Sequence, residues 1–247
     1  MSLKEREILI LEFLRERRSA TVDELCKALF VSEPTMRRDL AALNSQGKII
    51  RTYGGASYKS NPGENIPQEF REREHSDAKI IIGKKCLSII EDGDTVMVDG
   101  SSTALALLNV ISAKKSIAVI TNSAKAPLIL KDSGVKLFVT GGELAQNTLA
   151  YVGGHAEGFI RSFNADICFF SVRTLTTDGR LTDNAIAENS IRRAMMGSSK
   201  KSVLLLDSKK ISEPCMNTLC NLSDISAVVS EKDISEFFEE KHKNKFI

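Results

Sequence analysis

The stretch VSEPTMRRDL, residues 31–40, decides the fold of the N-terminal part of this 247-residue chain. Ser32 can cap a helix that begins at this point, and Pro34 is tolerated in its first turn. Gly47 then provides the residue that usually ends a helix. We therefore predict a helix that starts just after Ser32 and stops before Gly47.

The two faces of this helix differ in chemistry. The apolar face holds Met36, Leu40 and Leu43. The opposite face holds Thr35, Arg37 and Arg38, which inward packing does not explain. The pattern predicts a helix that buries one side and presents a polar, basic side to solvent.

Two further helices come before this one, and a short hairpin comes after it. Residues 3–17 carry apolar positions at helical spacing, and TVDE, from Thr21 to Glu24, has the form of a capping box. RTYGGA, residues 51–56, is a β-capable run that ends in a glycine pair, and it indicates a wing. Together these elements describe a winged helix-turn-helix, whose third helix enters the major groove of DNA.

The charge of the segment that contains this helix favours contact with a phosphate backbone, whereas the net charge of the whole chain gives no such indication. The whole chain carries only +2. Between residues 37 and 59, however, the chain has five basic residues and one acid, Asp39. The basic residues are Arg37, Arg38, Lys48, Arg51 and Lys59. Each neutralised phosphate would release a counterion, and Ser32 and Thr35 could bond phosphate or a base edge. The alternative is that these arginines only solvate a surface helix.

A linker separates this module from a second domain of a different class. We assign residues 1–57 to the winged helix-turn-helix, 58–74 to a linker rich in proline, glycine and serine, and 75–247 to an α/β domain. In the last of these, helical and strand patterns alternate, which is typical of a parallel sheet covered by helices. The expected strands are 95–98, 117–120, 136–140, 166–172, 202–206 and 227–230.

Several loops of the α/β domain carry residues suited to an anionic ligand. The loop DGSST follows a strand and precedes a helix, and its residues are Asp99, Gly100, Ser101, Ser102 and Thr103. Alone it could be plain helix capping. Thr121-Asn122 and Gly141-Gly142 also follow strands, and the carboxyl ends of parallel strands form the ligand crevice of open α/β sheets. We predict a phosphate cradle there.

Two charged residues extend this candidate site. Glu188 offers a carboxylate for sugar hydroxyls, and Lys209 offers an ammonium for phosphate. Both can equally be ordinary surface charges.

The combination of VSEPTMRRDL, Gly47 and RTYGGA resembles the N-terminal signature of DeoR-type transcriptional regulators, and the resemblance continues through nearly the whole chain. In that family the wing usually has histidine where Tyr53 stands. The resemblance implies that Thr35, Arg37, Arg38, Arg51 and the pair Gly54-Gly55 face DNA; Ser32, Lys48 and Tyr53 complete the expected set. It also implies a sensor domain with the fold of ribose-5-phosphate isomerase, which binds phosphorylated sugars with the loops named above.

One segment departs from the family pattern. Related sensor domains commonly read Gly-Val-Asp-Gly-Ile-Asp where this chain has SVRTLT, residues 171–176. Sugar isomerisation needs a carboxylate base, and Arg173 and Thr176 cannot serve as one at neutral pH. We therefore expect no catalytic residue. The change also suggests a ligand with a second anionic group that faces Arg173.

Composition indicates whether the protein is expected to hold a metal or to enter a membrane. The five cysteines are scattered, and the three histidines show no zinc-type spacing, so we expect no metal and no cofactor. No apolar stretch approaches the roughly 20 residues that span a bilayer, and the N-terminus has no secretory pattern. These features predict a cytoplasmic protein with no membrane partner.

The preferred hypothesis is a regulator, a repressor of carbohydrate metabolism genes, that binds double-stranded operator DNA as a homodimer or tetramer. A phosphorylated sugar would be its effector. The alternative is an isomerase-like enzyme with a nucleic-acid-binding module, for which Glu188 would be the lone candidate base. A purely structural oligomer would leave the arginine-rich wing unexplained.

Overall fold

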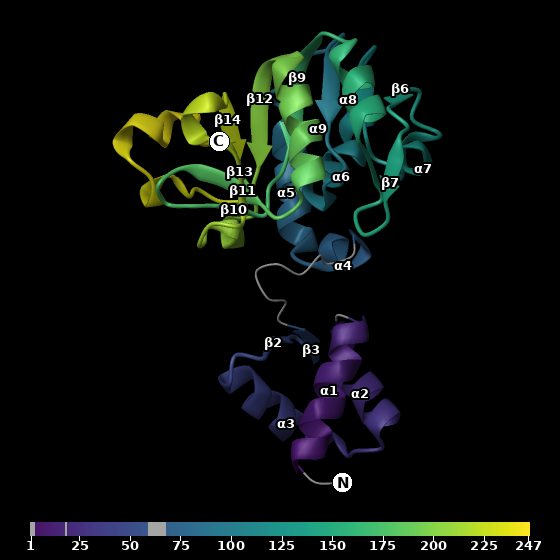
Figure 1. Ribbon diagram of the computed structural model, residues 1–247, viewed down its shortest axis with the longest axis vertical. Helices are drawn as coiled ribbons and strands as arrows, with labels where there is room; N and C mark the ends of the chain where they lie inside the picture. Colours follow the sequence, from purple (N-terminus) through teal and green to yellow (C-terminus); the bar gives the residue numbers. More distant parts are fainter. Residues whose placement is uncertain (1–2, 18, 59–67) are drawn as a thin grey trace. The chain divides into compact units, whose positions relative to one another are not determined.

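A computed structural model describes residues 3–17, 19–58 and 68–247 of the chain. Two compact units are present, Met1–Ile66 and Pro67–Ile247 (Figure 1). Each is described by itself below.

The first unit is a three-helix module with a small antiparallel sheet. Its helices are α1 (Leu3–Arg17), α2 (Val22–Leu29) and α3 (Glu33–Ser45). Its strands, in the order β1-β3-β2, are β1 (Ser19–Thr21), β3 (Gly55–Tyr58) and β2 (Ile49–Thr52). The capping box is confirmed, because the Thr21 hydroxyl accepts from the Glu24 amide at 3.2 Å and the Glu24 carboxylate accepts from the Thr21 amide at 2.7 Å.

The predicted apolar face of α3 forms the centre of this unit. Met36, Leu40 and Leu43 are fully buried against Leu14 of α1 and Leu25 of α2. Helix α3 ends where Gly47 takes a positive φ of 68°, and the Lys48 amide then donates to the Leu43 carbonyl at 3.0 Å. This reverse turn directs the chain into β2.

One buried ion pair ties α1 to α3. Arg6 donates through Nε to Asp39 Oδ2 at 2.6 Å and through Nη2 to Oδ1 at 3.1 Å. Asp39 is 1% exposed. The acid that stands among the basic residues in the sequence therefore points inward and does not dilute the positive surface.

The second unit is built on a six-stranded parallel sheet in the order β14-β12-β9-β4-β5-β6. Its strands are β4 (Thr95–Val98), β5 (Ala118–Thr121), β6 (Lys136–Val139), β9 (Ala165–Phe170), β12 (Ser199–Leu205) and β14 (Ala227–Val229). All five pairings are parallel. The sequence-based prediction of a parallel α/β sheet is confirmed.

Helices cover both faces of this sheet. One face packs on α8 (Gly154–Arg161) and α9 (Ile186–Gly197). The other packs on α5 (Ser76–Cys86), α6 (Ser102–Leu108) and α7 (Ala126–Leu130). Neighbouring residues of β4 point to opposite faces, as the strand period of two requires. Among the described residues, no helix is both long and apolar enough to cross a membrane.

The strand order reverses beside β4. From β4 the chain continues through β5 to β6 on one side, and it later returns to place β9, β12 and β14 on the other side. The loops after β4 and β9 therefore leave the sheet in opposite directions, which opens a crevice at their carboxyl ends.

Several short elements lie beyond what periodicity could predict. They are the hairpin β7 (Glu143–Ala145) and β8 (Ala150–Val152), the sheet of β10 (Thr174–Leu175), β11 (Arg180–Asp183) and β13 (Asn217–Asn221), and the 3-10 turns Ile111–Ala113, Ser208–Lys210, Leu222–Asp224, Ser235–Phe237 and Glu240–Lys245. Strands of two to five residues carry too few alternations to give a signal.

The expected linker, residues 58–74, needs a correction at its C-terminal end. Gln68–Arg73 form helix α4 and belong to the second unit. Residue 58 ends β3 in the first unit. Residues 59–67, which include most of the proline and glycine positions, lie outside the described part of the chain.

Candidate functional sites

A basic face, defined here as Arg37, Arg38, Lys48 and Arg51, lies on α3 and the strand that follows it. Arg37, Arg38 and Lys48 are exposed, and Arg51 is half-buried. Arg51 comes from β2, yet its Nη1 donates to the Arg37 carbonyl at 3.2 Å, and its amide donates to Asn44 Oδ1 at 3.1 Å. The side chain and the backbone of Arg51 are thus both held against α3.

The N-terminal turn of α3 is polar and exposed. The hydroxyls of Ser32 and Thr35 share a hydrogen bond at 3.0 Å. Ser32 occupies the N-cap position, but its side chain makes no capping bond, so the expected capping role is not seen. Glu33 pairs with Arg37 at 2.5 Å one turn on. Glu33 therefore competes for a guanidinium that could otherwise reach phosphate.

The two glycines of the wing have different structural roles. Tyr53 and Gly54 form the tip: Tyr53 is fully exposed, and Gly54 has a positive φ of 79° with open space around it. Gly55 is buried, and a Cβ there would lie 2.2 Å from the Ala20 carbonyl oxygen of β1. Gly55 is therefore explained by close packing of β3 on β1, and its expected position on the DNA-facing surface is corrected.

In the second unit, the loops after β4 and β9 meet at the switch point. The Asp99 amide donates to the Phe169 carbonyl at 3.0 Å, and the Ser171 amide donates to Asp99 Oδ2 at 3.4 Å. Asp99 also accepts from the Ser101 hydroxyl at 2.5 Å through Oδ1. This carboxylate holds the two loops together.

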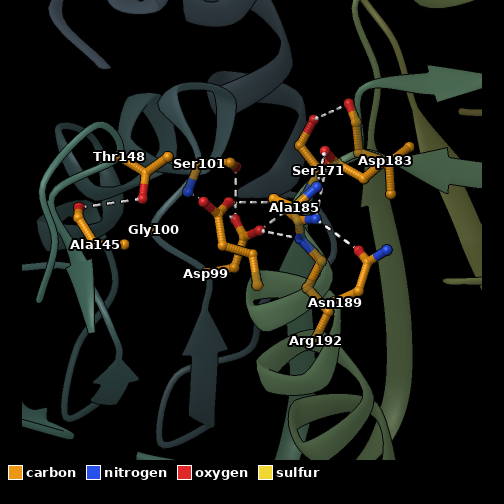
Figure 2. A network of polar contacts seen from close by, with 12 residues as sticks. Asp99, Gly100, Ser101, Ala145, Thr148, Ser171, Asp183, Ala185, Asn189 and Arg192 are labelled. Carbon is orange, nitrogen blue, oxygen red and sulfur yellow. Dashed lines mark hydrogen bonds and ion pairs between the residues drawn. The ribbon is translucent and has the colours of Figure 1, made fainter. Parts of the chain in front are cut away.

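A buried arginine on α9 gathers the carboxylates of this edge (Figure 2). Arg192, 2% exposed, donates to Asp99 Oδ2 at 3.0 Å, to Asp183 Oδ2 at 2.9 Å and to Glu188 Oε2 at 3.2 Å. It also donates to Asn189 Oδ1 at 2.8 Å. We call Arg192 with Asp99, Asp183 and Glu188 the carboxylate network.

The network explains the electrostatics of the edge. Burial alone would lower the pKa of Arg192, but the three surrounding carboxylates raise it above its usual value. Burial raises the pKa of Asp183, and the charge of Arg192 with two backbone amides outweighs this, so that pKa is lowered. Asp99 and Glu188, both expected to contact ligand, are each ion-paired with Arg192.

Other predicted ligand residues brace the backbone. Asn122 is buried, accepts from the Gly100 amide at 2.8 Å and donates to the Tyr151 carbonyl at 2.9 Å. The Thr121 hydroxyl accepts from the Ser123 amide at 3.1 Å. A Cβ on Gly100 would lie 2.7 Å from the Cβ of Ala150. Gly100, Thr121 and Asn122 therefore hold the backbone of the loops that were predicted to bind phosphate.

The glycine pair after β6 also sets the backbone shape of a predicted ligand loop. Gly141 and Gly142 both have positive φ, 63° and 110°. A Cβ on Gly142 would lie 2.9 Å from the Val152 carbonyl oxygen, so this position requires glycine, whereas Gly141 faces open space.

The start of α6 keeps groups available for an anion. Ser101 caps the helix by accepting from the Ala104 amide at 3.2 Å. Ser102 and Thr103 supply the first amides of the helix, which have no partners within it. The Thr103 hydroxyl is fully buried and has no hydrogen-bond partner within the described ranges.

Lys209, which the sequence predicted to contact ligand, and its neighbour Lys210 differ in their surroundings. Lys209 is exposed, and its Nζ lies 3.4 Å from His75 Nδ1. Lys210 donates to Ser171 Oγ at 2.9 Å and to the Val172 carbonyl at 3.1 Å. The short 3-10 turn after β12 reverses the directions of these neighbours. Burial, with the charges of Lys79 and Arg71, lowers the pKa of Lys210 to about 8.

Arg173 and Thr176, in the segment that departs from the family pattern, have different surroundings. Arg173 lies half-buried between β9 and β10, and its charge acts on Arg71. Thr176 belongs to a hairpin turn, where its hydroxyl accepts from the Arg180 amide at 3.0 Å and donates to Asp178. Thr176 therefore supports the turn between β10 and β11.

Sequence reasoning missed Arg192, Asp183 and Lys210. The four-residue spacing of Glu188 and Arg192 on a predicted helix was a usable signal for an ion pair. Nothing local in the sequence links Arg192 to Asp99, because 93 positions separate them.

Family comparisons agree with this two-unit architecture. Residues 74–232 match the DeoR C terminal sensor domain, and residues 6–61 match the DeoR-like helix-turn-helix domain. The chain belongs to the DeoR family of regulators. The resemblance noted in the sequence is thereby confirmed.

Curated relatives cover almost the full chain. The HTH-type transcriptional regulator GolR of Listeria innocua is 29% identical over 96% of this chain and 94% of its own length. The transcriptional repressor AccR of Agrobacterium fabrum is 26% identical over 100% of this chain and 97% of its own. The L-fucose operon activator of Haemophilus influenzae is 28% identical over 94% and 93%.

Solved structures give a weaker likeness over part of the chain. Ribose 5-phosphate isomerase A from Methanocaldococcus jannaschii superposes with a TM-score of 0.42 at 14% identity, covering 56% of this chain and 55% of that one.

Proposed function

We propose that this chain is a transcriptional regulator whose first unit binds operator DNA and whose second unit binds a phosphorylated sugar that changes the affinity for DNA. The observation that carries the proposal is the contact between Arg51 and the Arg37 carbonyl, which joins the wing to α3 in one basic face. Guanidinium and ammonium groups on the exposed side of α3 and on the adjoining wing suit a phosphate backbone flanking the major groove.

The alternative that these arginines only solvate the helix fits less well. A solvating charge has no need of a fixed position, yet the Arg51 side chain and backbone are both tied to α3. Asp39, the acid next to Arg38 in the sequence, faces inward and is paired with Arg6, so Glu33 is the acid that competes for Arg37.

The sugar-phosphate assignment rests on the cradle at the start of α6 and on Lys210. The amides of Ser102 and Thr103, the Thr103 hydroxyl and the Lys210 ammonium are donors that suit an anionic oxygen. One relative is named for an L-fucose operon, which suggests carbohydrate genes as targets. AccR is named a repressor, and we propose the same sign here.

An enzymatic role has little support from this edge. Glu188, the lone candidate base, is 9% exposed and accepts from Arg192. A carboxylate held by a buried guanidinium is not free to approach a proton of the substrate. We therefore propose a non-catalytic sensor that acts in the cytoplasm, where its DNA lies.

The DNA half of the proposal is tested by fluorescence anisotropy with the full chain. We expect tighter binding to duplex from upstream of its own gene than to a scrambled duplex of equal length. Arg38→Ala should weaken specific binding roughly 10- to 100-fold and should lower the slope against salt by about one. Arg161→Ala, an exposed arginine on α8, is the control. Equal affinity of the wild type for both duplexes would contradict the proposal.

The effector half is tested by thermal shift with a panel of sugar phosphates and the matching free sugars. A ligand that binds only the folded state raises the melting temperature. The active compound should also change the affinity for the upstream duplex, because an effector must bind the two states of the regulator unequally. Self-association is expected from the two-fold symmetry of operators and can be measured by sedimentation.

A further inference from the structure

Helix α4 is fixed onto the carboxyl edge of the sheet by polar contacts at both of its ends. The Gln68 amide donates to the Asn147 carbonyl at 2.7 Å, and Gln68 Nε2 donates to the Gly100 carbonyl at 2.9 Å. Glu72 pairs with Lys125 at 2.8 Å. Lys79 donates to the carbonyls of Arg71 and Glu74. In Figure 1, α4 lies at the end of the unit to which the arrow of β12 points.

Three side chains at this contact have buried polar atoms without hydrogen-bond partners among the described residues. They are Arg71 (Nε and Nη2), Gln68 (Oε1) and Thr103 (Oγ1). Gln68 is 1% exposed and Thr103 is fully buried. Gln68 and Arg71 are three positions apart, so they share one face of α4, and Gln68 already contacts the loop that leads to Thr103. Helix α4 also packs on α6.

A buried guanidinium with free N–H groups is costly, since burial removes its water. That burial lowers the pKa of Arg71, although a guanidinium stays charged in proteins. The charges of Glu188 and Asp183 act on Arg71, but neither carboxylate is within hydrogen-bond distance of it. Both are bound by Arg192 instead. The three carboxylates outnumber Arg192, so their charge favours a cation at Arg71, yet Arg71 Nε and Nη2 have no hydrogen-bond acceptor among the described residues and can donate to a ligand oxygen.

We propose that Arg71 of helix α4 binds the phosphate group of the effector, together with the Thr103 hydroxyl. The proposal rests on the proposed function and names the residue that completes its anion site. A guanidinium presents two parallel N–H groups to two phosphate oxygens, and Nε and Nη2 are such a pair. Arg71 lies between the two matched family regions, which end at residue 61 and begin at residue 74.

The position of Arg71 gives the site a regulatory consequence. Helix α4 is the first described element of the second unit, and β3 at Tyr58 is the last described element of the first. Bound phosphate adds an ion pair that fastens α4 to α6. The effector thereby changes the stability of the helix from which the chain leads back to the DNA-binding unit.

The test uses the full chain with inorganic phosphate and ribose 5-phosphate as probes. Titration calorimetry should show that Arg71→Gln weakens binding of both probes roughly tenfold or more, with Arg71→Lys between the two. Arg161→Gln is the matched control. Hydrogen exchange of the wild type should show that either probe protects the amides of α4, and that α3 is unaffected in the absence of DNA.

The outcomes separate the proposal from the function on which it rests. If the wild type binds a probe and Arg71→Gln binds it equally, Arg71 has no ligand role, while the sensor function stands. If the wild type binds neither probe, both are overturned. Should Arg71→Gln fail to fold, Thr103→Val and the protection of α4 in the wild type decide. Weaker binding with intact folding for Thr103→Val, together with protection of α4, supports the proposal; unchanged binding or an unprotected α4 overturns it.

Discussion

The basic face of the first unit and the carboxylate network of the second use arginine in opposite ways. Arg38 is exposed, and no ion pair or hydrogen bond to its side chain is seen within the described ranges, whereas Arg192 is 2% exposed and bonds to three carboxylates. An exposed cation contributes little to folding and remains available to a partner. A buried, fully paired cation is fixed by the fold and unavailable to ligand. Burial and pairing, more than residue type, therefore separate binding residues from structural ones.

The largest effect should follow from removing the cation of the carboxylate network. Arg192→Met leaves Asp99, Asp183 and Glu188 close together without a counter-charge. We expect the second unit to lose about 3–5 kcal/mol of unfolding free energy. Hydrogen exchange of β4 and β9 amides measures this without interference from the first unit.

The same variant should have a distinctive dependence on pH. Without Arg192, the main charge that lowers the pKa of Asp183 is lost, and burial then raises that pKa above its value in the unfolded chain. Folding is then favoured at low pH, and stability falls as pH rises through the raised pKa of Asp183. Arg161→Met, which removes a cation from an exposed pair with Glu157, is the control. Equal stability of the two variants would show that the network does not hold the edge together.

The second-largest effect should come from the titration of Lys210. The pKa of Lys210 is lowered to about 8, and an anionic effector favours its charged form. Affinity for a sugar phosphate should therefore fall about tenfold between pH 7 and pH 9 as the ammonium loses its proton. Calorimetry in buffers of different ionisation enthalpy should detect proton uptake on binding near pH 8.

The control for this pH profile must address a second lysine. The pKa of Lys79 is also lowered to about 8, mainly by burial. Lys210→Arg should keep affinity and flatten the profile, because arginine stays charged, whereas Lys79→Arg should leave the profile in place. The reverse pattern would assign the titration to Lys79.

A smaller effect should reveal how far the basic face is restrained. Glu33 pairs with Arg37 at 2.5 Å, and both side chains are more than half exposed. Glu33→Gln removes a negative charge from the N-terminal end of α3, which we propose faces DNA, and frees Arg37. We expect affinity for operator duplex to rise severalfold, with a steeper dependence on salt. Asp23→Gln, which breaks an exposed pair with Lys27 on α2, is the control, and an equal gain there would indicate a general charge effect.

The sequence predicted the elements that repeat a pattern and missed those that depend on distant contacts. The period of α3, the capping box at Thr21 and the apolar strands of the parallel sheet are local, so they were predictable. Lys209 and Lys210 are neighbours, and only the turn after β12 decides which one contacts Ser171. Gly54 and Gly55 likewise differ only through the approach of β1.

The smallest effect should come from the turn that leads into the basic face. Phe30 ends α2 with φ 53° and is 96% exposed, so it carries the cost of a left-handed conformation without gaining buried contacts. Phe30→Gly should stabilise the first unit by about 0.5–1 kcal/mol, because relief of strain outweighs the added entropy of the unfolded chain. Hydrogen exchange of α3 amides measures the gain. Tyr53→Gly removes another exposed aromatic from a position without positive φ, and it should bring no gain; equal stabilisation by both would show that strain at Phe30 is not the cause.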